Sequence, residues 1–273
     1  MSRAGETAPP SGIITLITDF GLSDPFAGVM TGAILSRFPA ARVVDLCHGI
    51  RPQAVAEAAF WLERCYPWFP PGSVHVAVVD PGVGSARRIL AAAIDAHYFL
   101  APDNGLLGQR LLDSPGARVH AIELDRLGLA RPSATFHGRD VFAPVAAAIA
   151  SGTLDLDGVG DPARPKPCVL ATPTKDSQAF VGEVVSVDRY GNLISNLDEA
   201  LVEGGADLHL MIGDRRIPLH RTYSDVEPGE LLALVNAFGV IEVAARGQSA
   251  ERVLGIGRGA PLRLNGSCRA HAT

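Results

Sequence analysis

SVHVAVVDPGVG, residues 73–84, is the segment from which the architecture of the first half of this 273-residue chain follows. Residues 73–79 are rich in Val and Ala without regular polar alternation, which is typical of a strand buried on both faces of a parallel sheet. The run ends in Asp80-Pro81-Gly82, a combination that favours a turn. Because functional groups of open α/β sheets gather where parallel strands end, Asp80 is a candidate site residue.

Strand-like and helix-like segments alternate around this segment. The apolar patterns predict further strands over residues 13–18, 42–46, 89–94 and 97–101, and helices over residues 26–38, 53–66 and 141–150. Strands that alternate with helices indicate an α/β layer with a largely parallel sheet.

The second half of the chain has a different pattern. Four prolines, at positions 162, 165, 167 and 173, indicate a linker. Short strands with few helices follow, at 180–187, 208–212, 216–219, 231–235 and 240–244, which is typical of a small β-barrel or sandwich. We therefore predict a flexible N-terminus over 1–12, an α/β domain over 13–165 and a barrel-like all-β domain over 166–273. The cleft between two domains is a usual place for a ligand.

Composition excludes several classes of function. Hydrophobic residues make up 47% and charged residues 19% of the chain, which is typical of a globular protein. The net charge is −5 and no Lys/Arg block occurs, so we expect no nucleic-acid partner. No run reaches the roughly 18 apolar residues of a membrane span, and residues 1–12 lack the apolar part of a secretory signal. We expect a cytoplasmic protein with no membrane partner.

Metal and nucleotide-loop chemistry also lack their sequence signals. The eight histidines form no H-x-H or H-E-x-x-H pair, and the cysteines are scattered, at Cys47, Cys65, Cys168 and Cys268. We interpret these cysteines as buried or incidental thiols and expect no metal site. A P-loop and a G-x-S-x-G elbow are absent from the sequence, and Gly82-Val83-Gly84 is too little of a dinucleotide fingerprint.

Polar turns follow predicted strands or precede a helix in three places, at residues 18–21, 80–84 and 135–140. An aspartate in such a turn could serve only to cap it. Three of these clusters in one predicted domain favour a site.

Five segments carry a family resemblance, and they keep their order along the chain: ITDFG (17–21), VVDPGVGSARR (78–88), APDNGLL (101–107), TFHGRDVFAP (135–144) and VDRYGNLISN (187–196). Together they resemble the S-adenosyl-L-methionine hydroxide adenosyltransferase family, which is grouped with fluorinases and chlorinases. The resemblance implies an α/β N-terminal domain, a β-barrel C-terminal domain and a homotrimer with sites at subunit interfaces. It also implies a hydrolase that cleaves S-adenosyl-L-methionine with water, giving adenosine and L-methionine, with no cofactor besides this substrate.

The resemblance implies that Asp80, Arg87 and His137 handle the water. The leaving group is a neutral thioether and needs no acid, whereas water is a poor nucleophile and needs orientation or deprotonation. His137 could accept a proton near neutral pH, while Arg87 could stabilise hydroxide but not serve as a base. Asp80 could orient the others or accept the proton itself, so the identity of the base stays open. Arg88 and Arg139 we interpret as surface or structural charges.

The resemblance also assigns the parts of the substrate. It places the ribose diol on Asp19, the adenine on Asn192 and Tyr223, and the methionine amino group on Asp188, with Tyr190 as a wall. A β-turn alone is the alternative for residues 188–192, since D-x-x-G-N is good turn chemistry. The remaining substrate-binding candidates are Phe20, Gln53, Phe136, Gly138, Asn236 and Glu242.

Differences from the relatives refine the expected activity. Halogenases carry tyrosines at positions 80 and 137, and a carboxylate at Asp80 would repel a halide, so we expect water as the nucleophile. Ala237 and Arg246 depart from the family pattern, which has Ser and Asn there. Two alternatives therefore stay open: a non-catalytic S-adenosylmethionine- or adenosine-binding protein, and a hydrolase of a related adenosyl sulfonium.

Overall fold

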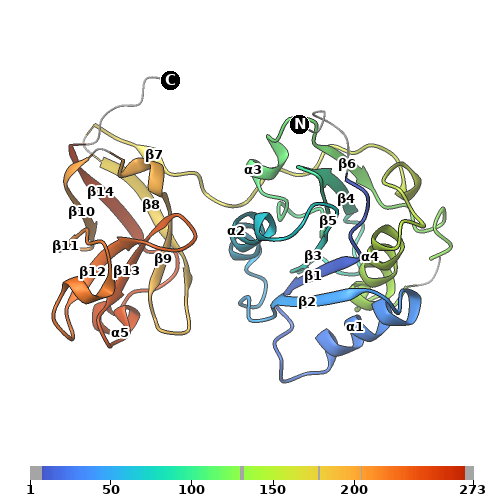
Figure 1. Cartoon of the computed structure of the whole chain (residues 1–273), viewed down its shortest axis with the longest axis horizontal. Coiled ribbons are helices and arrows are strands. Elements are labelled where there is room, and N and C mark those ends of the chain that lie inside the picture. Colours follow the sequence, from blue (N-terminus) through green and yellow to red (C-terminus); the bar gives the residue numbers. More distant parts are fainter. Residues whose placement is uncertain (1–7, 130–131, 178, 204, 268–273) are drawn as a thin grey trace. The chain divides into compact units, whose positions relative to one another are not determined.

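The computed structural model describes residues 8–129, 132–177, 179–203 and 205–267. The chain divides into two compact units, Met1–Leu170 and Ala171–Thr273 (Figure 1). Of the four cysteines, Cys268 lies outside the described residues, and Cys47, Cys65 and Cys168 are free thiols. In the described part of the chain, no helix is long and apolar enough to cross a membrane.

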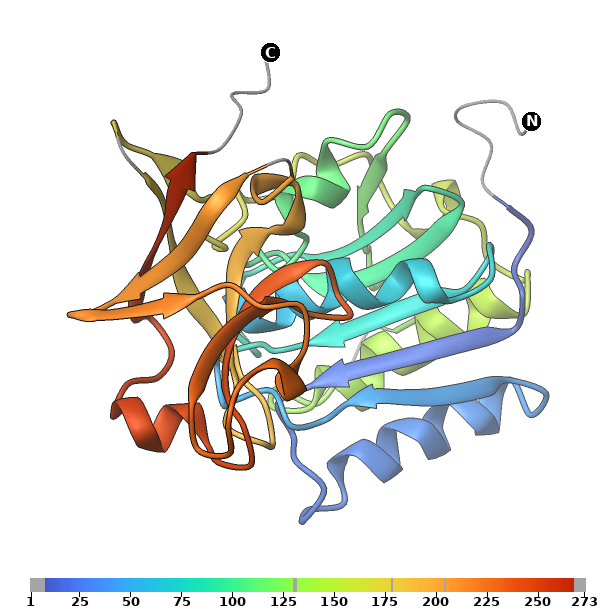
Figure 2. The ribbon, with the colours of Figure 1, turned by 60° about the vertical axis from the view of Figure 1, so that its left-hand side comes forward.

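The first unit is built on one six-stranded sheet in the order β2-β1-β3-β5-β4-β6. Its strands are β1 (Ile13–Thr18), β2 (Arg42–Cys47), β3 (Val74–Val78), β4 (Ile89–Ile94), β5 (His97–Pro102) and β6 (Arg118–Ala121). β1 pairs in parallel with β2 and β3, and β3 with β5, whereas β4 is antiparallel to both of its neighbours. Figure 2 shows the arrows of β1, β2 and β3 pointing the same way. The predicted α/β layer with a largely parallel sheet is confirmed.

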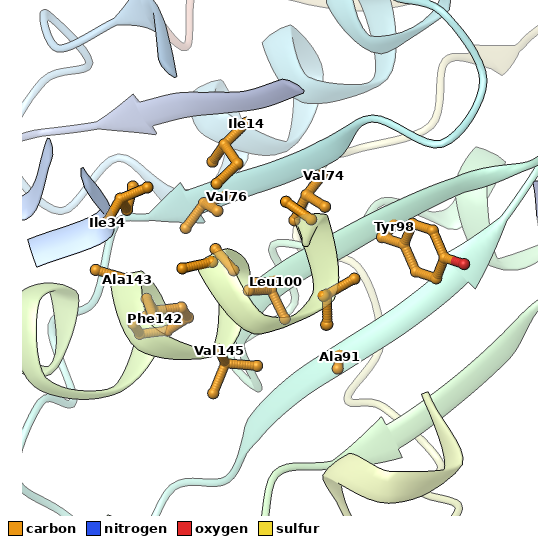
Figure 3. Close-up of a cluster of buried hydrophobic side chains, with 14 of the residues drawn as sticks. Ile14, Ile34, Val74, Val76, Ala91, Tyr98, Leu100, Phe142, Ala143 and Val145 are labelled. Atoms are coloured by element: carbon orange, nitrogen blue, oxygen red, sulfur yellow. The ribbon is translucent and has the colours of Figure 1, made fainter. Parts of the chain in front are cut away.

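Helices cover both faces of this sheet. They are α1 (Phe26–Arg37), α2 (Val55–Cys65), η1 (Tyr66–Trp68), α3 (Gln109–Leu112), the π-helical turn η2 (Gly138–Phe142), α4 (Ala143–Ala150) and η3 (Asp157–Val159). Figure 1 shows α1 and α4 on one side of the sheet and α2 on the other. The α1–α4 side holds the larger core, in which β1 and β3 side chains pack on Phe142 and Val145 (Figure 3). All five residues of β3 are buried, as the apolar run predicts.

The order of the strands indicates where a ligand site is expected in the first unit. The chain leaves β1 through α1 on one face and returns from β2 to β3 through α2 on the other face. The direction of winding therefore reverses between β1 and β3, and the carboxyl ends beside such a reversal are where open α/β sheets bind ligands. Thr18 and Val78 are partners in the β1–β3 register, so Asp19 and Asp80 follow neighbouring strand ends.

The second unit is an antiparallel, nearly closed β-barrel with the strand order β11-β10-β14-β8-β9-β13-β12. Its strands are β7 (Thr174–Lys175, paired with β8), β8 (Ala179–Val187), β9 (Leu193–Asp198), β10 (Ala206–Ile212), β11 (Arg215–Pro218), β12 (Leu231–Val235), β13 (Val240–Ala245) and β14 (Pro261–Ser267). The gap between β11 and β12 is bridged after β11, where the backbone N–H of His220 donates to the Ala233 carbonyl at 2.8 Å. The predicted all-β barrel is confirmed, and its short helices are η4 (Glu199–Leu201), η5 (Tyr223–Asp225) and α5 (Ala250–Leu254).

Candidate active site

Asp80, Arg87 and His137 form one hydrogen-bonded cluster in the first unit. The Nε of Arg87 donates to Oδ1 of Asp80 at 2.6 Å, and Nη2 of Arg87 donates to Oδ2. The same Nη2 donates to Nδ1 of His137 at 2.9 Å. The side chains of Arg87 and Asp80 are only 6% and 5% exposed, so this bidentate ion pair is well shielded from water.

The turn between β3 and β4 holds two members of the cluster. The N–H of Val83 donates to the Asp80 carbonyl at 3.2 Å, and the Ser85 hydroxyl donates to the Gly82 carbonyl at 2.7 Å. Gly84 has a φ of +78°, and a Cβ there would clash with the carbonyl oxygen of Ala134. A side chain at this position would therefore push the turn away from the loop that carries His137.

His137 precedes the π-helical turn Gly138–Phe142, a type of distortion that is frequent at functional sites. Pro144, near the start of α4, has no N–H to donate and its ring would conflict with the carbonyl four residues back, which accounts for the wider turn. Asp140 closes the loop by accepting a hydrogen bond from the Ser133 N–H at 2.8 Å.

The hydrogen bond from Arg87 sets the protonation state of His137. A guanidinium has no acceptor, so Nδ1 must offer its lone pair to Arg87 and the ring hydrogen must be on Nε2. Burial and then the Arg87 charge lower the pKa of His137, against Asp80 and Asp140, which raise it. The geometry and the pKa direction both favour a neutral imidazole that donates from Nε2.

Aromatic side chains form a wall beside the cluster. The Phe20 and Phe136 ring centroids are 5.8 Å apart, and Phe26 lies 5.3 Å from Phe136. Gly138 leaves room for them, because a Cβ there would lie 3.1 Å from the Phe136 ring and 3.3 Å from the Phe20 ring. Phe26 was not among the predicted residues; in the structure it is an aromatic side chain at the start of α1 that is 46% exposed.

The side chain of Asp19 contacts the backbone of Gln53. The N–H of Gln53 donates to Oδ2 of Asp19 at 2.8 Å, and Gln53 has a φ of +66°. This φ lies in the left-handed region, which non-glycine residues seldom occupy and which is enriched near functional sites. The contact ties the loop before α2 to the end of β1.

Arg88 and Arg139 are each engaged in a pair of their own. Arg88 donates from Nε and Nη2 to Oδ2 of the buried Asp103, at 2.9 and 2.6 Å. Arg139 pairs with Asp140 at 2.6 Å and lies over the Phe136 ring, 5.3 Å from its centroid. These contacts support the structural interpretation of both arginines.

The second unit contains a hollow of about 820 Å³ on the barrel. Its lining includes four of the predicted substrate-binding residues, Asp188, Tyr190, Asn192 and Tyr223. Residues that the sequence did not single out also line it: Arg189, Gly191, Ala245, Gly247, Gln248, Ser249, Glu251 and Arg252. Arg246, which departs from the family pattern, lines the hollow too and donates to the Val226 carbonyl at 2.6 Å.

Asp188 organises the turn at one wall of the hollow. Its Oδ1 accepts hydrogen bonds from the N–H groups of Tyr190 and Asn192, at 2.8 and 2.9 Å, and its Oδ2 accepts from Nδ2 of Asn192 at 2.9 Å. Gly191 lets this turn pack on Ser249, where any side chain would clash. Asp188 is therefore a turn residue, as the β-turn interpretation holds, and at the same time lines the hollow.

Asn236 and Glu242 lie behind Tyr223. The Tyr223 hydroxyl donates to Oε1 of Glu242 at 2.7 Å, and Nδ2 of Asn236 donates to Oε2 at 3.2 Å. Neither Asn236 nor Glu242 is among the residues that line the hollow. The Asp80–Arg87–His137 cluster and its aromatic wall thus belong to the first unit, and the hollow belongs to the second.

The described ranges contain no group of three or more His, Cys, Asp or Glu side chains that could hold a metal ion. Metal independence of the reaction stays a prediction.

Comparisons with known proteins cover both units. The model of the SAM hydroxide adenosyltransferase N-terminal domain matches residues 14–160, and that of the C-terminal domain matches residues 182–263. Proteins called (R)-S-adenosyl-L-methionine hydrolase from Thermus thermophilus and Salinispora arenicola are each 40% identical to this chain, over 92% of it and 98% and 97% of their own lengths. A fluorinase from Actinopolyspora mzabensis is 25% identical over 93% of this chain and 97% of its own.

Solved structures agree with these matches. A conserved protein from Thermotoga maritima has a TM-score of 0.84 and 32% identity, covering 94% of this chain and 100% of its own. A Thermus thermophilus protein has a TM-score of 0.75 and 35% identity over the same shares. The chain therefore belongs to the S-adenosyl-L-methionine hydroxide adenosyltransferase family.

Proposed function

We propose that this chain hydrolyses S-adenosyl-L-methionine to adenosine and L-methionine. The observation that carries the proposal is the shielded Asp80–Arg87–His137 cluster in a chain that is 40% identical, over nearly its full length, to proteins called hydrolases of this compound. The water oxygen forms a bond to the ribose 5′ carbon while the carbon–sulfur bond breaks. Its electron pair neutralises the sulfonium, and one water proton is released.

The cluster divides the work on water. Arg87 supplies positive charge where hydroxide character develops, and His137 donates a hydrogen bond from Nε2 that orients the water oxygen. Nδ1 of His137 is occupied by Arg87, which leaves the Asp80 carboxylate as the proton acceptor. Both Asp80 oxygens accept from Arg87 but each keeps a further lone pair.

Seven of the other predicted residues hold the substrate. We assign the ribose diol to Asp19 and the adenine to Tyr223 and Asn192, with Phe20, Gln53, Phe136 and Gly138 shaping the pocket around the reacting carbon. Asn192 supports this assignment: its Nδ2 faces Asp188, so its Oδ1 is the acceptor that the adenine amino group requires. We extend to this chain the (R) configuration at sulfur that its relatives' names carry.

We propose further that the chain works as a homotrimer in the cytoplasm, with sites at subunit interfaces, as the family resemblance implies. Apolar side chains at Leu22, Phe26 and Val29 are 81%, 46% and 41% exposed close to the Phe20 wall, which is compatible with a covering subunit. Light scattering during size exclusion tests the assembly, and a monomer mass at working concentration would reject the trimer.

The activity is tested by incubating purified protein with each sulfonium epimer of S-adenosylmethionine and separating the products by liquid chromatography. We expect equimolar adenosine and methionine, faster from the (R) epimer and unaffected by a chelator. Added chloride should give no 5′-chloro-5′-deoxyadenosine. Binding of substrate or adenosine without turnover would instead favour the non-catalytic alternative. Because Ala237 and Arg246 depart from the family pattern, a related adenosyl sulfonium is the next substrate to test.

A further inference from the structure

Glu242 is a carboxylate inside the barrel wall whose two oxygens are both engaged by the chain itself. It belongs to β13 and is only 3% exposed. Oε1 accepts from the Tyr223 hydroxyl and Oε2 from Asn236. A buried carboxylate satisfied in this way has little to offer a ligand in the hollow, although the sequence pattern marks it as a binding residue.

Tyr223 has the opposite exposure. Its side chain is 45% exposed and lines the hollow, while its hydroxyl is anchored in the wall behind. Its backbone is fixed as well, because it begins a single helical turn that carries a reciprocal capping box between Thr222 and Asp225. The backbone and the far end of the ring are therefore both held, which fixes the long axis of the ring.

Asn236 fixes the other side of the carboxylate. Its Oδ1 accepts from the N–H groups of Phe238 and Val240, at 2.9 and 3.4 Å, in the turn between β12 and β13. The Asn236 amide is thus oriented with Nδ2 toward Glu242. Burial raises the pKa of the Glu242 carboxyl, whereas the hydrogen bonds from Tyr223 and Asn236 lower it.

We infer that Glu242 is a positioning residue that, together with Asn236, holds the Tyr223 ring as a preformed flat wall of the hollow, against which the base of an adenosyl ligand stacks. The identity of the ligand rests on the proposed function. A ring fixed before binding loses less conformational freedom when the ligand arrives, so the anchor is expressed in affinity.

Three single variants and one double variant test this role. Tyr223→Phe removes only the hydroxyl, Glu242→Leu removes the acceptor, and Glu242→Gln keeps an oxygen for the hydroxyl. By calorimetry we expect the Kd for adenosine to rise about three- to tenfold for Tyr223→Phe and for Glu242→Leu, the size of one lost hydrogen bond. Glu242→Gln should stay within about twofold of the wild type.

The double variant separates positioning from direct contact. If Glu242 acts through the Tyr223 hydroxyl, Tyr223→Phe/Glu242→Leu binds no more weakly than either single variant, because one interaction is lost once. Additive losses would mean that Glu242 contacts the ligand itself, and an unchanged Kd in Glu242→Leu would mean that the anchor is irrelevant. Either result overturns the inference.

A readout without ligand keeps the inference separate from the proposed function. In protein labelled with 3-fluorotyrosine, the fluorine signal of Tyr223 is assigned by its loss in Tyr223→Phe. We expect this signal to move in Glu242→Leu and to return toward its wild-type position in Glu242→Gln. A wild type that binds neither adenosine nor S-adenosylmethionine would reject the proposed function, whereas a fluorine signal unmoved by Glu242→Leu would reject the anchor.

Discussion

Arg87 connects Asp80 with His137, and the asymmetry of its contacts separates the roles of its two partners. It donates twice to Asp80 and once to His137, so the carboxylate is the cluster's negative charge and the imidazole stays neutral. A variant that removes the negative charge of Asp80 should therefore differ in rate from a variant that replaces His137 with a neutral polar side chain.

For Asp80→Asn we expect kcat to fall by about 10²–10⁴, the usual contribution of a general base. His137→Gln should fall less, because an amide can still donate to water and accept from Arg87. Initial rates of adenosine formation measure both, with circular dichroism as a folding check, since Asp80→Asn leaves Arg87 buried without its carboxylate. A larger loss in His137→Gln than in Asp80→Asn would instead assign the proton to His137.

Gly138 lies so close to its neighbours that an added methyl group should affect both stability and substrate binding. A methyl group there would lie against Phe136, Phe20 and the Met30 sulfur, the last at 3.5 Å. Crowding of this kind costs about 1–3 kcal/mol, and we expect Gly138→Ala to lower the free energy of unfolding by that amount and to raise KM. Gly32→Ala is the matched control: its helical site in α1 is open, and we expect a gain of about 0.5–1 kcal/mol.

Among the elements, the β3–β4 turn shows how backbone geometry sets the site. Gly84 needs a positive φ and also a missing side chain, because of the Ala134 carbonyl. Gly128 has a φ of +65° but open space around it. A comparison of Gly84 with Gly128 therefore distinguishes the cost of a positive φ alone from the added cost of a steric clash with a neighbouring backbone.

We expect Gly128→Ala to lower the free energy of unfolding by about 1 kcal/mol, the cost of the left-handed conformation alone. Gly84→Ala should cost more and should also reduce kcat, because the turn that carries Arg87 moves away from the loop that carries His137. Denaturant unfolding and adenosine formation, measured on both variants, check this. Equal behaviour of the two variants would show that the contact at Ala134 does not position the cluster.

The elements also show how far sequence patterns carry. Long apolar runs predict β1, β3, β4 and β5 to within two residues, because burial on both faces leaves a strong signal. β6 (Arg118–Ala121) and β9 (Leu193–Asp198) were missed, since a short strand with polar residues does not stand out from a loop. β14 was missed too, although its Leu262 and Leu264 alternate with exposed or half-buried residues and so carried a period-two signal.

The candidate site was likewise predicted only in part from the sequence. The family resemblance implied Asp80, Arg87 and His137, and the structure brings these three together. The resemblance could not show that Glu242 faces the back of Tyr223 rather than the hollow, because that depends on which face of β13 each residue occupies. The π-helical turn was also missed, although Pro144 behind the predicted loop was its visible cause.

At the scale of the whole molecule, the two units have separate cores, and we expect them to differ in their sensitivity to acid. The first unit contains a buried chain of hydrogen bonds from Thr15 to His75 at 2.8 Å and from His75 to His97 at 3.1 Å. Tyr66, Phe69 and Phe99 pack their rings on this pair, and Asp95 is the charged group that acts on His97. Both tryptophans, Trp61 and Trp68, belong to the same unit, so tryptophan fluorescence reports on it alone.

Burial and the neighbouring His97 lower the pKa of His75 to about 3, and burial lowers the pKa of His97 against the charge of Asp95, which raises it. Both histidines carry more protons when unfolded, so stability is full above about pH 6.5 and falls below it. For His75 the fall continues toward pH 3, by up to about 1.4 kcal/mol per pH unit, and His97 acts in the same direction. On acidification we therefore expect the tryptophan emission to shift red before the far-ultraviolet dichroism of the barrel is lost. His97→Phe should move this first transition to lower pH, whereas the control variant His209→Gln in the barrel should not. A single transition that both probes report and that His97→Phe does not move would contradict the assignment to the histidine pair.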